Sequence, residues 1–192
     1  MIGGRSGRSI LHIGCGPDKL PGALGIDVNP QSKADVIHDL DAHPWPLEDS
    51  SFDYIHAENV LEHVKDFVGA MEEIHRVARP GATVLVRMPF MSSCNFPTDP
   101  THRRAATSRT FEYFQPSKFL GNYGYSNARF ELLEFHFLRV YPGRVGKLLR
   151  IVDQLLIPFL ERHATTYEHF FAYLYPMHDI EFRLEVRKKT DS

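Results

Sequence analysis

The residues best suited to chemistry gather in one segment, residues 10–27, which reads ILHIGCGPDKLPGALGID. Two short apolar runs, each typical of a buried parallel strand, flank a turn that contains Gly14 and Gly16. Glycines after a strand let the backbone approach a ligand closely, and an acid ending the next strand can accept hydrogen bonds from both ribose hydroxyls. Asp27 stands at that position, so the segment predicts a nucleotide-type ligand at this sheet edge.

The same segment departs from the dinucleotide-binding fingerprint. That fingerprint needs a third glycine where Lys19 stands, and an acid about twenty residues further on, so NAD(P) and flavins are disfavoured. The six residues Pro17–Gly22 separate Gly16 from the second run, too few for the usual helix. A return along a strand of roughly 17 Å is feasible, since six extended residues span about 20 Å. We expect a helix-free crossover.

Two histidines are the candidates for a general base, because an unperturbed imidazole titrates near neutral pH. His63 falls on the predicted helix after the fourth strand, where the alternative is a surface or capping histidine. His102 falls in the loop DPTHRR, where the alternative is a turn stabilised by hydrogen bonds of Asp99 and Thr101. Both are expected near the ligand edge of the sheet.

Other polar residues have two interpretations each. Arg103, Arg104 and Arg109 could clamp a phosphate or carboxylate of a substrate, or form a solvated basic turn. Cys15 fits as a small residue in the glycine turn, and Trp45 as a loop anchor in the core. No Cys/His cluster has zinc-ligand spacing, so the sequence predicts no metal site.

The elements that must position these residues alternate between strands and helices. Short apolar runs predict strands near residues 10–14, 23–28, 35–38, 52–56, 82–90, 132–141 and 180–188, the last antiparallel. Apolar residues at helical spacing from Val60 to Val77 predict a helix that Pro80-Gly81 ends, with Asp66 as an N-cap for its second part. This order predicts an α/β fold with a mostly parallel, Rossmann-like sheet, one antiparallel strand, and helices on both faces.

A helical insertion is expected before the last strand, within residues 143–178. Its stripe from Val145 to Leu160 follows a basic start, as in helices that lie on membrane surfaces. The alternatives are that the stripe covers the protein's own core, covers a second copy in a homodimer, or roofs a substrate pocket.

Composition limits the class of protein. The chain has 192 residues with 43% hydrophobic content, enough for one substantial core. A net charge of -2 argues against a general nucleic-acid binder. Two cysteines suggest no disulfide framework, and no segment has the pattern of a signal peptide or spanning helix, so we expect a soluble cytoplasmic protein.

Several motifs together resemble a known family. The series LHIGCG, GIDVNP, VIHDLDAHPWPLEDSSFDYI, VLEHV and RVARPG is similar to that of class I S-adenosylmethionine-dependent methyltransferases, specifically the small type-11 domain. The resemblance covers residues 9–90, and DPTHRRAATSRTFEYF resembles a segment of members with the same shortened glycine loop.

The resemblance implies S-adenosylmethionine at the carboxyl ends of the strands of a seven-stranded sheet. It assigns cofactor contacts to these residues: Gly14, Cys15, Gly16, Asp27, Val28, Asp39, Leu40 and Glu58. It also implies one methyltransferase domain over residues 1–192, with 9–90 as the cofactor-binding core and 91–128 and 143–178 as acceptor-pocket segments. The acceptor would be a small molecule or a sugar- or lipid-linked intermediate. The shortened glycine loop keeps open the alternative of a non-catalytic cofactor-binding protein of this fold. A nucleotide-binding oxidoreductase is a third hypothesis.

Overall fold

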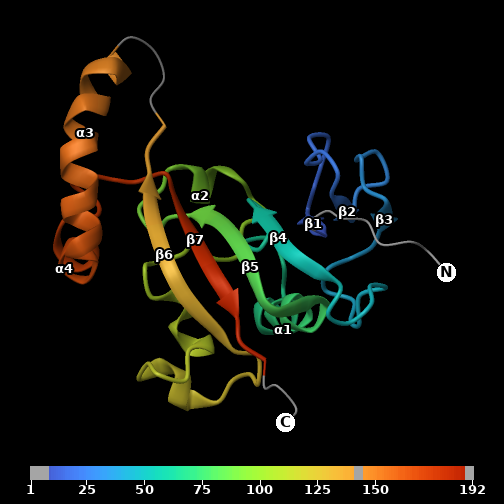
Figure 1. Ribbon diagram of the computed structural model, residues 1–192. Helices are drawn as coiled ribbons and strands as arrows, with labels where there is room; N and C mark the ends of the chain where they lie inside the picture. Colours follow the sequence, from blue (N-terminus) through green and yellow to red (C-terminus); the bar gives the residue numbers. More distant parts are fainter. Residues whose placement is uncertain (1–8, 141–144, 189–192) are drawn as a thin grey trace.

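A seven-stranded sheet forms the centre of the computed structural model, which describes residues 9–140 and 145–188 (Figure 1). Its strands are β1 (Ile10–Ile13), β2 (Leu24–Asp27), β3 (Val36–Ile37), β4 (Phe52–Glu58), β5 (Ala78–Pro89), β6 (Phe130–Leu138) and β7 (Asp179–Val186). They lie in the order β3-β2-β1-β4-β5-β7-β6, and β7 is antiparallel to both of its neighbours. The predicted Rossmann-like sheet with one antiparallel strand is confirmed.

The strand order reverses at β1, which lies between β2 and β4. The chain leaves β1 toward one edge of the sheet and later continues from β4 toward the other, so the loops diverge at the carboxyl end of β1. Ligands of open α/β sheets bind in the crevice at such a switch point. The topology therefore directs attention to the loops after β1, β2, β3 and β4.

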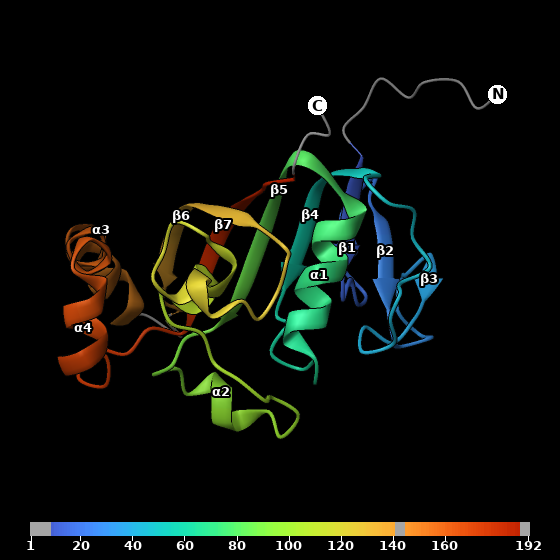
Figure 2. The same ribbon diagram turned by 90° about the horizontal axis from the view of Figure 1, so that it is seen from below.

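Helix α1 (Phe67–Val77) connects β4 to β5 and packs one face of the sheet, as Figures 1 and 2 show. Asp66 caps it by accepting a hydrogen bond from the Gly69 backbone N–H at 2.8 Å. The sequence predicted that the helix begins at Val60, but the residues before Asp66 form a turn. The cause is a contact with a residue far along the chain: the Asp41 carboxylate accepts hydrogen bonds from the backbone N–H groups of Lys65 and Asp66, which therefore make no helical bonds.

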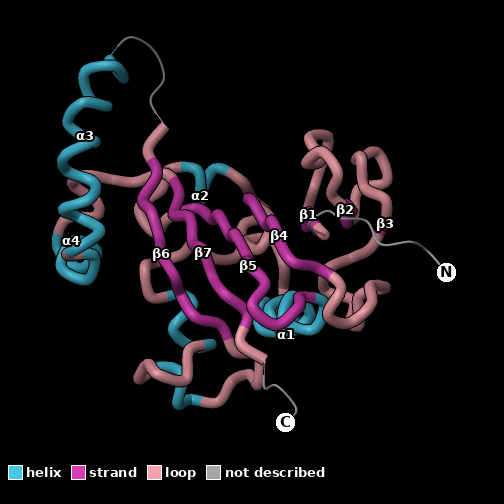
Figure 3. The backbone as a smooth tube through the Cα atoms, in the orientation of Figure 1, coloured by secondary structure: helices cyan, strands magenta, loops and turns pink. Residues whose placement is uncertain are grey.

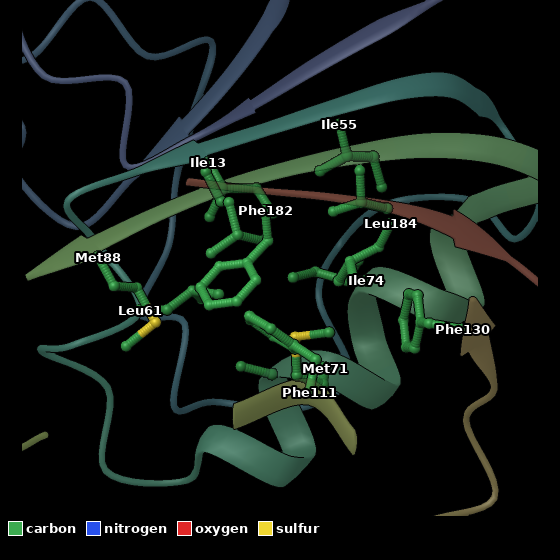
Figure 4. Packing of buried hydrophobic residues seen from close by; sticks show 14 of the residues in the cluster. Ile13, Ile55, Leu61, Met71, Ile74, Met88, Phe111, Phe130, Phe182 and Leu184 are labelled. Atoms are coloured by element: carbon green, nitrogen blue, oxygen red, sulfur yellow. The ribbon is translucent and has the colours of Figure 1, made fainter. Parts of the chain in front are cut away.

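The core lies between the sheet, α1 and the segment that contains the 3-10 turns η1 (Thr110–Phe114) and η2 (Leu120–Tyr123) (Figure 4). We call residues 110–123 the aromatic segment. Phe111 of η1 is buried edge-on against Phe182 of β7, with ring centroids 4.7 Å apart, and Met71 and Ile74 of α1 are fully buried. Burying each such side chain contributes roughly 2 kcal/mol, which fixes α1 and therefore the turn before it.

Helices are not distributed over both faces as the sequence predicted. In the described residues, loops and not helices connect β1 to β2, β2 to β3 and β3 to β4. Crossovers toward that edge would lie on the face opposite α1, since parallel crossovers are right-handed. Side chains of that face are partly exposed and largely polar, and include His56, Glu58 and Arg87.

The insertion before β7 forms α3 (Val145–Arg162) and α4 (Ala164–Phe170) beside the edge strand β6, whereas the short α2 (Asn95–Thr98) follows β5 (Figures 1 and 3). Asp153 of α3 is buried and pairs with Arg139 after β6 at 3.2 Å. On its other side, Leu155 is 79% exposed and Phe159 58% exposed. No helix in the described part of the chain is long and apolar enough to cross a membrane. The first two residues of the predicted insertion lie outside the described residues.

Candidate functional site

The glycine turn after β1 has a conformation that suits glycine. Gly14 and Gly16 have φ of +62° and +49°, in the left-handed region that L side chains rarely adopt. A Cβ on Gly14 would lie 2.4 Å from Val60 Cγ2, so the turn also passes close to the loop after β4. The carboxylate of Asp27 accepts hydrogen bonds from the backbone N–H groups of Gly16 and Asn29, each at 2.8 Å. The turn and the acid are thus fixed against each other.

The crossover from β1 to β2 contains no helix, as predicted. His12 Nδ1 accepts a hydrogen bond from the Leu20 backbone N–H at 3.1 Å. Lys19 pairs with Asp35 at 2.7 Å, and the same carboxylate accepts from the Gly25 backbone N–H. These contacts tie the short loop to the strands beside it. Burial, followed by the neighbouring His56, lowers the pKa of His12 to about 4, so its ring is neutral near pH 7.

A cavity of about 270 Å³ opens beside the glycine turn. We call it the glycine-turn cavity. Of the residues predicted to contact a cofactor, it is lined by Gly14, Asp27, Val28, Asp39 and Leu40. These come from the ends of β1 and β2 and from the loop after β3, so the fold brings them together at the switch point of the sheet.

The other three predicted cofactor residues do not line this cavity. Cys15 is buried, and its thiol lies so close to β2 that a Cβ on Gly25 would come within 2.7 Å of it. Gly16 contributes its backbone N–H to Asp27. Glu58 is directed to the open face of the sheet, where its carboxylate pairs with Arg87 and lies 3.2 Å from His56 Nε2.

Asp41, Val60 and Val64 also line the glycine-turn cavity, and the sequence did not single them out. The spacing of Asp39 and Asp41 could have indicated that both carboxylates face the same site. Val60 and Val64 gave no such signal, because their spacing fits the apolar face of a helix. Trp45 is a buried anchor, as expected: its indole N–H donates to the Leu40 carbonyl at 3.1 Å and so holds one wall of the cavity.

The two predicted base candidates lie side by side. His63 lines the glycine-turn cavity, and its ring centroid is 4.6 Å from that of His102. His63 lies in the turn before α1 rather than on the helix. Burial, and then the neighbouring His102, lowers the pKa of His63. The hydrogen bonds of Asp99 and Thr101 that were expected to stabilise the His102 turn are also present, at 2.6 and 2.8 Å.

The three arginines of this loop bind the protein itself. Arg104 donates to the backbone carbonyls of Leu61, Val64 and Lys65, and its guanidinium lies 5.2 Å from the Phe67 ring centroid. Arg103 donates to the His63 carbonyl at 3.1 Å. Arg109 pairs with Glu112 at 2.8 Å. The guanidiniums of Arg103 and Arg104 therefore fix the turn that carries His63.

A second cavity, of about 300 Å³, lies at the carboxyl ends of β4 and β5. We call it the Glu62 cavity. Its walls include Asn59, Glu62, Asp99, His102 and Asp179, so it is strongly acidic. Glu62 is fully buried, and neither carboxylate oxygen has a hydrogen-bond partner. Burial raises the pKa of Glu62 to about 7 and also raises the pKa of Asp179.

A third, more apolar hollow of about 620 Å³ lies over the aromatic segment, with Phe67, Met91, Tyr113 and Phe114 among its walls. We call it the aromatic groove. Glu168 and His169 of α4 also line it. Both segments that were predicted to line an acceptor pocket, residues 91–128 and 143–178, therefore contribute to the aromatic groove.

Comparison with solved structures identifies the fold. A SAM-dependent methyltransferase from Archaeoglobus fulgidus superposes with a TM-score of 0.55 and 17% identity, over 94% of this chain and 86% of that one. The YcgJ protein of Bacillus subtilis gives a TM-score of 0.59 and 14% identity, over 97% and 94%. The architecture is therefore the fold that S-adenosylmethionine-dependent methyltransferases have.

A family model and curated relatives match parts of the sequence. Residues 11–86 match the family described as a methyltransferase domain, in agreement with the motifs that resemble the type-11 domain. An uncharacterized 37.1 kDa protein in transposon Tn4556 of Streptomyces fradiae is 32% identical over 111 residues, which are 46% of this chain. The matched parts span about a third or less of the curated relatives.

Proposed function

We propose that this protein binds S-adenosylmethionine in the glycine-turn cavity and transfers its methyl group to a small molecule in the Glu62 cavity. The observation that carries the proposal is the position of these two cavities. One lies at the switch point of a methyltransferase fold, and the other lies beside it, across the Glu62–His63 turn. A methyl donor and an acceptor would face each other there.

The lining of the glycine-turn cavity matches the parts of the cofactor. Asp27 is fixed by two backbone N–H groups, and its remaining lone pairs can accept the ribose hydroxyls. Val28 is 64% exposed beside it, and Leu40 with Val60 offers further apolar surface for the adenine ring. Without a helix after Gly16, the methionine carboxylate would be held by N–H groups of the turn and not by a helix N-terminus.

The size of the Glu62 cavity favours a small acceptor, because about 300 Å³ is at the lower end of the range for ligand pockets. Its acidic walls favour an acceptor that brings positive charge or hydrogen-bond donors. A lipid-linked acceptor would need the aromatic groove for its chain.

Methyl transfer breaks the bond from the methyl carbon to the sulfonium sulfur as a lone pair of the acceptor forms a new bond to that carbon. S-adenosylhomocysteine leaves, and any proton on the acceptor atom must go to a base. We assign that role to His63 and His102, which border the two cavities. Alignment of the two reactants contributes most of the remaining rate enhancement.

The cofactor site is tested by titration calorimetry with S-adenosylhomocysteine. Asp27→Ala should weaken binding more than 100-fold, and Asp27→Asn at least 10-fold because one hydroxyl acceptor remains. Asp18→Ala is the matched control, since Asp18 is an exposed carboxylate of the same loop, outside the cavity lining.

Undiminished affinity in Asp27→Ala, with an unchanged circular dichroism spectrum, would contradict the site. Tight binding without turnover of any compound in a broad panel of small amines and alcohols would instead favour a non-catalytic binding protein. A thermal shift with NAD(P) but not S-adenosylmethionine would favour an oxidoreductase.

A further inference from the structure

We propose that Glu62, His63 and His102 bind one divalent first-row transition-metal ion between the glycine-turn cavity and the Glu62 cavity. One ligand atom from each of the three side chains lies within 4.8 Å of the others. His102 Nε2 is 3.8 Å from Glu62 Oε1. Two imidazole nitrogens and one carboxylate oxygen form a ligand set that catalytic zinc and iron(II) sites use, with the remaining positions open. The proposal does not depend on methyl transfer.

The buried carboxylate of Glu62 is the observation that points to a cation ligand. It is fully buried, faces the Glu62 cavity, and has no hydrogen-bond donor on either oxygen. Burying a carboxylate without partners is costly, so native structures normally pair it or place it on a metal. Among described residues the nearby charged groups add no fixed cation, because Arg103 and Arg104 are directed to backbone carbonyls.

Each imidazole has a second hydrogen bond that selects its tautomer. His102 Nδ1 lies 3.1 Å from the Phe96 carbonyl, which can only accept, so this nitrogen carries the proton. His63 Nδ1 lies 2.8 Å from Thr101 Oγ1, whose own hydroxyl donates to Asp99. His63 must therefore donate as well. With Nδ1 as the donor in each ring, Nε2 is the nitrogen left to bind a metal, and such second hydrogen bonds are what fix a metal-binding tautomer.

The backbone that carries these ligands is held rigidly. Arg103 donates its backbone N–H to the Glu62 carbonyl at 2.8 Å, and Arg104 binds the carbonyls on either side of the Glu62–His63 pair. The loop that contains His102 is thus hydrogen-bonded to the turn that contains Glu62 and His63. A site with ligands in fixed positions loses little conformational entropy when an ion binds.

The donor set selects the kind of ion. Imidazole nitrogens suit zinc, iron, cobalt and nickel, whereas Mg²⁺ and Ca²⁺ prefer oxygen ligands. A cation here would supply Lewis-acid polarisation of an acceptor oxygen in the Glu62 cavity. With the ion bound, His63 and His102 would be ligands, so the role of base that we assigned to them above belongs to the metal-free protein.

The test is metal binding by the whole chain after dialysis against a chelator. We expect one equivalent of Zn²⁺ in equilibrium dialysis, and visible absorption bands of low-coordinate Co²⁺ that one equivalent of Zn²⁺ abolishes. Glu62→Gln and His102→Gln should each weaken Zn²⁺ binding at least 10-fold. His169→Gln is the control, since His169 is an exposed histidine of α4.

Unchanged Zn²⁺ affinity in both site variants, or failure of the wild-type chain to take up either ion, would overturn the proposal. Glu62→Gln removes a buried charge and should fold, which its circular dichroism spectrum checks. S-adenosylhomocysteine titrations of the same samples separate this proposal from the function above. Asp27→Ala should lose S-adenosylhomocysteine binding and keep Zn²⁺ binding. His102→Gln should lose Zn²⁺ binding and keep S-adenosylhomocysteine binding.

Discussion

At the scale of single residues, the charged side chains of the site form two groups. Some face a cavity, and others bind the backbone that carries the cavity-lining residues. The position of Asp27 in the glycine-turn cavity was predictable, because an acid that ends the second strand after a glycine turn lies at the ligand edge of such a sheet. Glu58, two residues beyond the Phe52–His56 run from which the fourth strand was predicted, lies on the open face of the sheet beside Arg87 and outside the lining of the glycine-turn cavity, because adjacent residues of a strand face opposite sides of the sheet. Glu62 was missed: its importance comes from burial and from His102, which the fold brings to it.

Arg104 illustrates the second group. The sequence left two interpretations of this basic loop, a clamp for an anion and a solvated turn, whereas the guanidinium binds three carbonyls of the turn after β4. Backbone carbonyls that form no helix or sheet bonds need such a partner.

Replacing Arg104 by Met should therefore destabilise the protein by about 2–3 kcal/mol, because several charge-assisted hydrogen bonds are lost and the carbonyls of Leu61 and Val64 remain unpaired. Urea unfolding at pH 7 measures the change. Arg109→Met, which removes an exposed pair with Glu112, should change stability by no more than about 0.5 kcal/mol. Equal effects of the two variants would show that Arg104 does not hold the turn.

At the scale of elements, the sequence predicted strands better than it predicted helix α1. Each strand has its own short apolar run, so its position follows from local pattern. The start of α1 depends on Asp41, a residue more than twenty positions earlier that accepts the N–H groups of Lys65 and Asp66. The helix-free crossover was predictable from length alone, but the histidine that holds it was not.

His12 makes the crossover sensitive to acid. Its folded pKa of about 4 lies below the ordinary 6.5, so the unfolded chain binds the proton more readily than the folded one. The stability contribution is fully present above pH 6.5 and is lost as pH falls toward 4, and between pH 7 and 5 it amounts to about 2 kcal/mol. Protonation of Nδ1 would also displace the Leu20 N–H.

We expect the free energy of unfolding to fall more steeply between pH 7 and pH 5 in the wild-type chain than in His12→Asn, whose side-chain oxygen can accept from Leu20 without titrating. Urea titrations at both pH values measure the difference. Burial also lowers the pKa of His63 and His75, so some slope should remain in the variant. Parallel pH dependences would rule out His12 as a source.

At the scale of the whole molecule, the sheet and the insertion differ in how they are held. The central strands β4, β5 and β7 have neighbours on both sides and a buried face. Helix α3 lies beside the edge strand with Ile151 and Leu155 61% and 79% exposed. Its amphipathic pattern predicted a helix correctly, but the sequence could not say that much of the stripe stays uncovered in the monomer.

Hydrogen exchange should reveal this difference. We expect amides of residues 149–162 to exchange at least 10-fold faster than those of α1, which is also a helix but buries Met71 and Ile74. Amides of β4 and β5 should be the slowest. Equal protection of α3 and α1 in the monomer would mean that the insertion opens only with global unfolding.

The open face of the sheet affects the residue pattern of the strands β4 and β5. Parallel strands are normally covered by helices on both faces of the sheet, and their sequences are then nearly continuous runs of apolar residues. In β4 and β5, buried residues such as Ile55, Ala57, Val84 and Val86 alternate with partly exposed ones, which is the period expected of an antiparallel sheet facing water. Because no helix covers this face in the described residues, alternate positions of β4 and of the second half of β5 are partly exposed, so these two parallel strands have a sequence period of two.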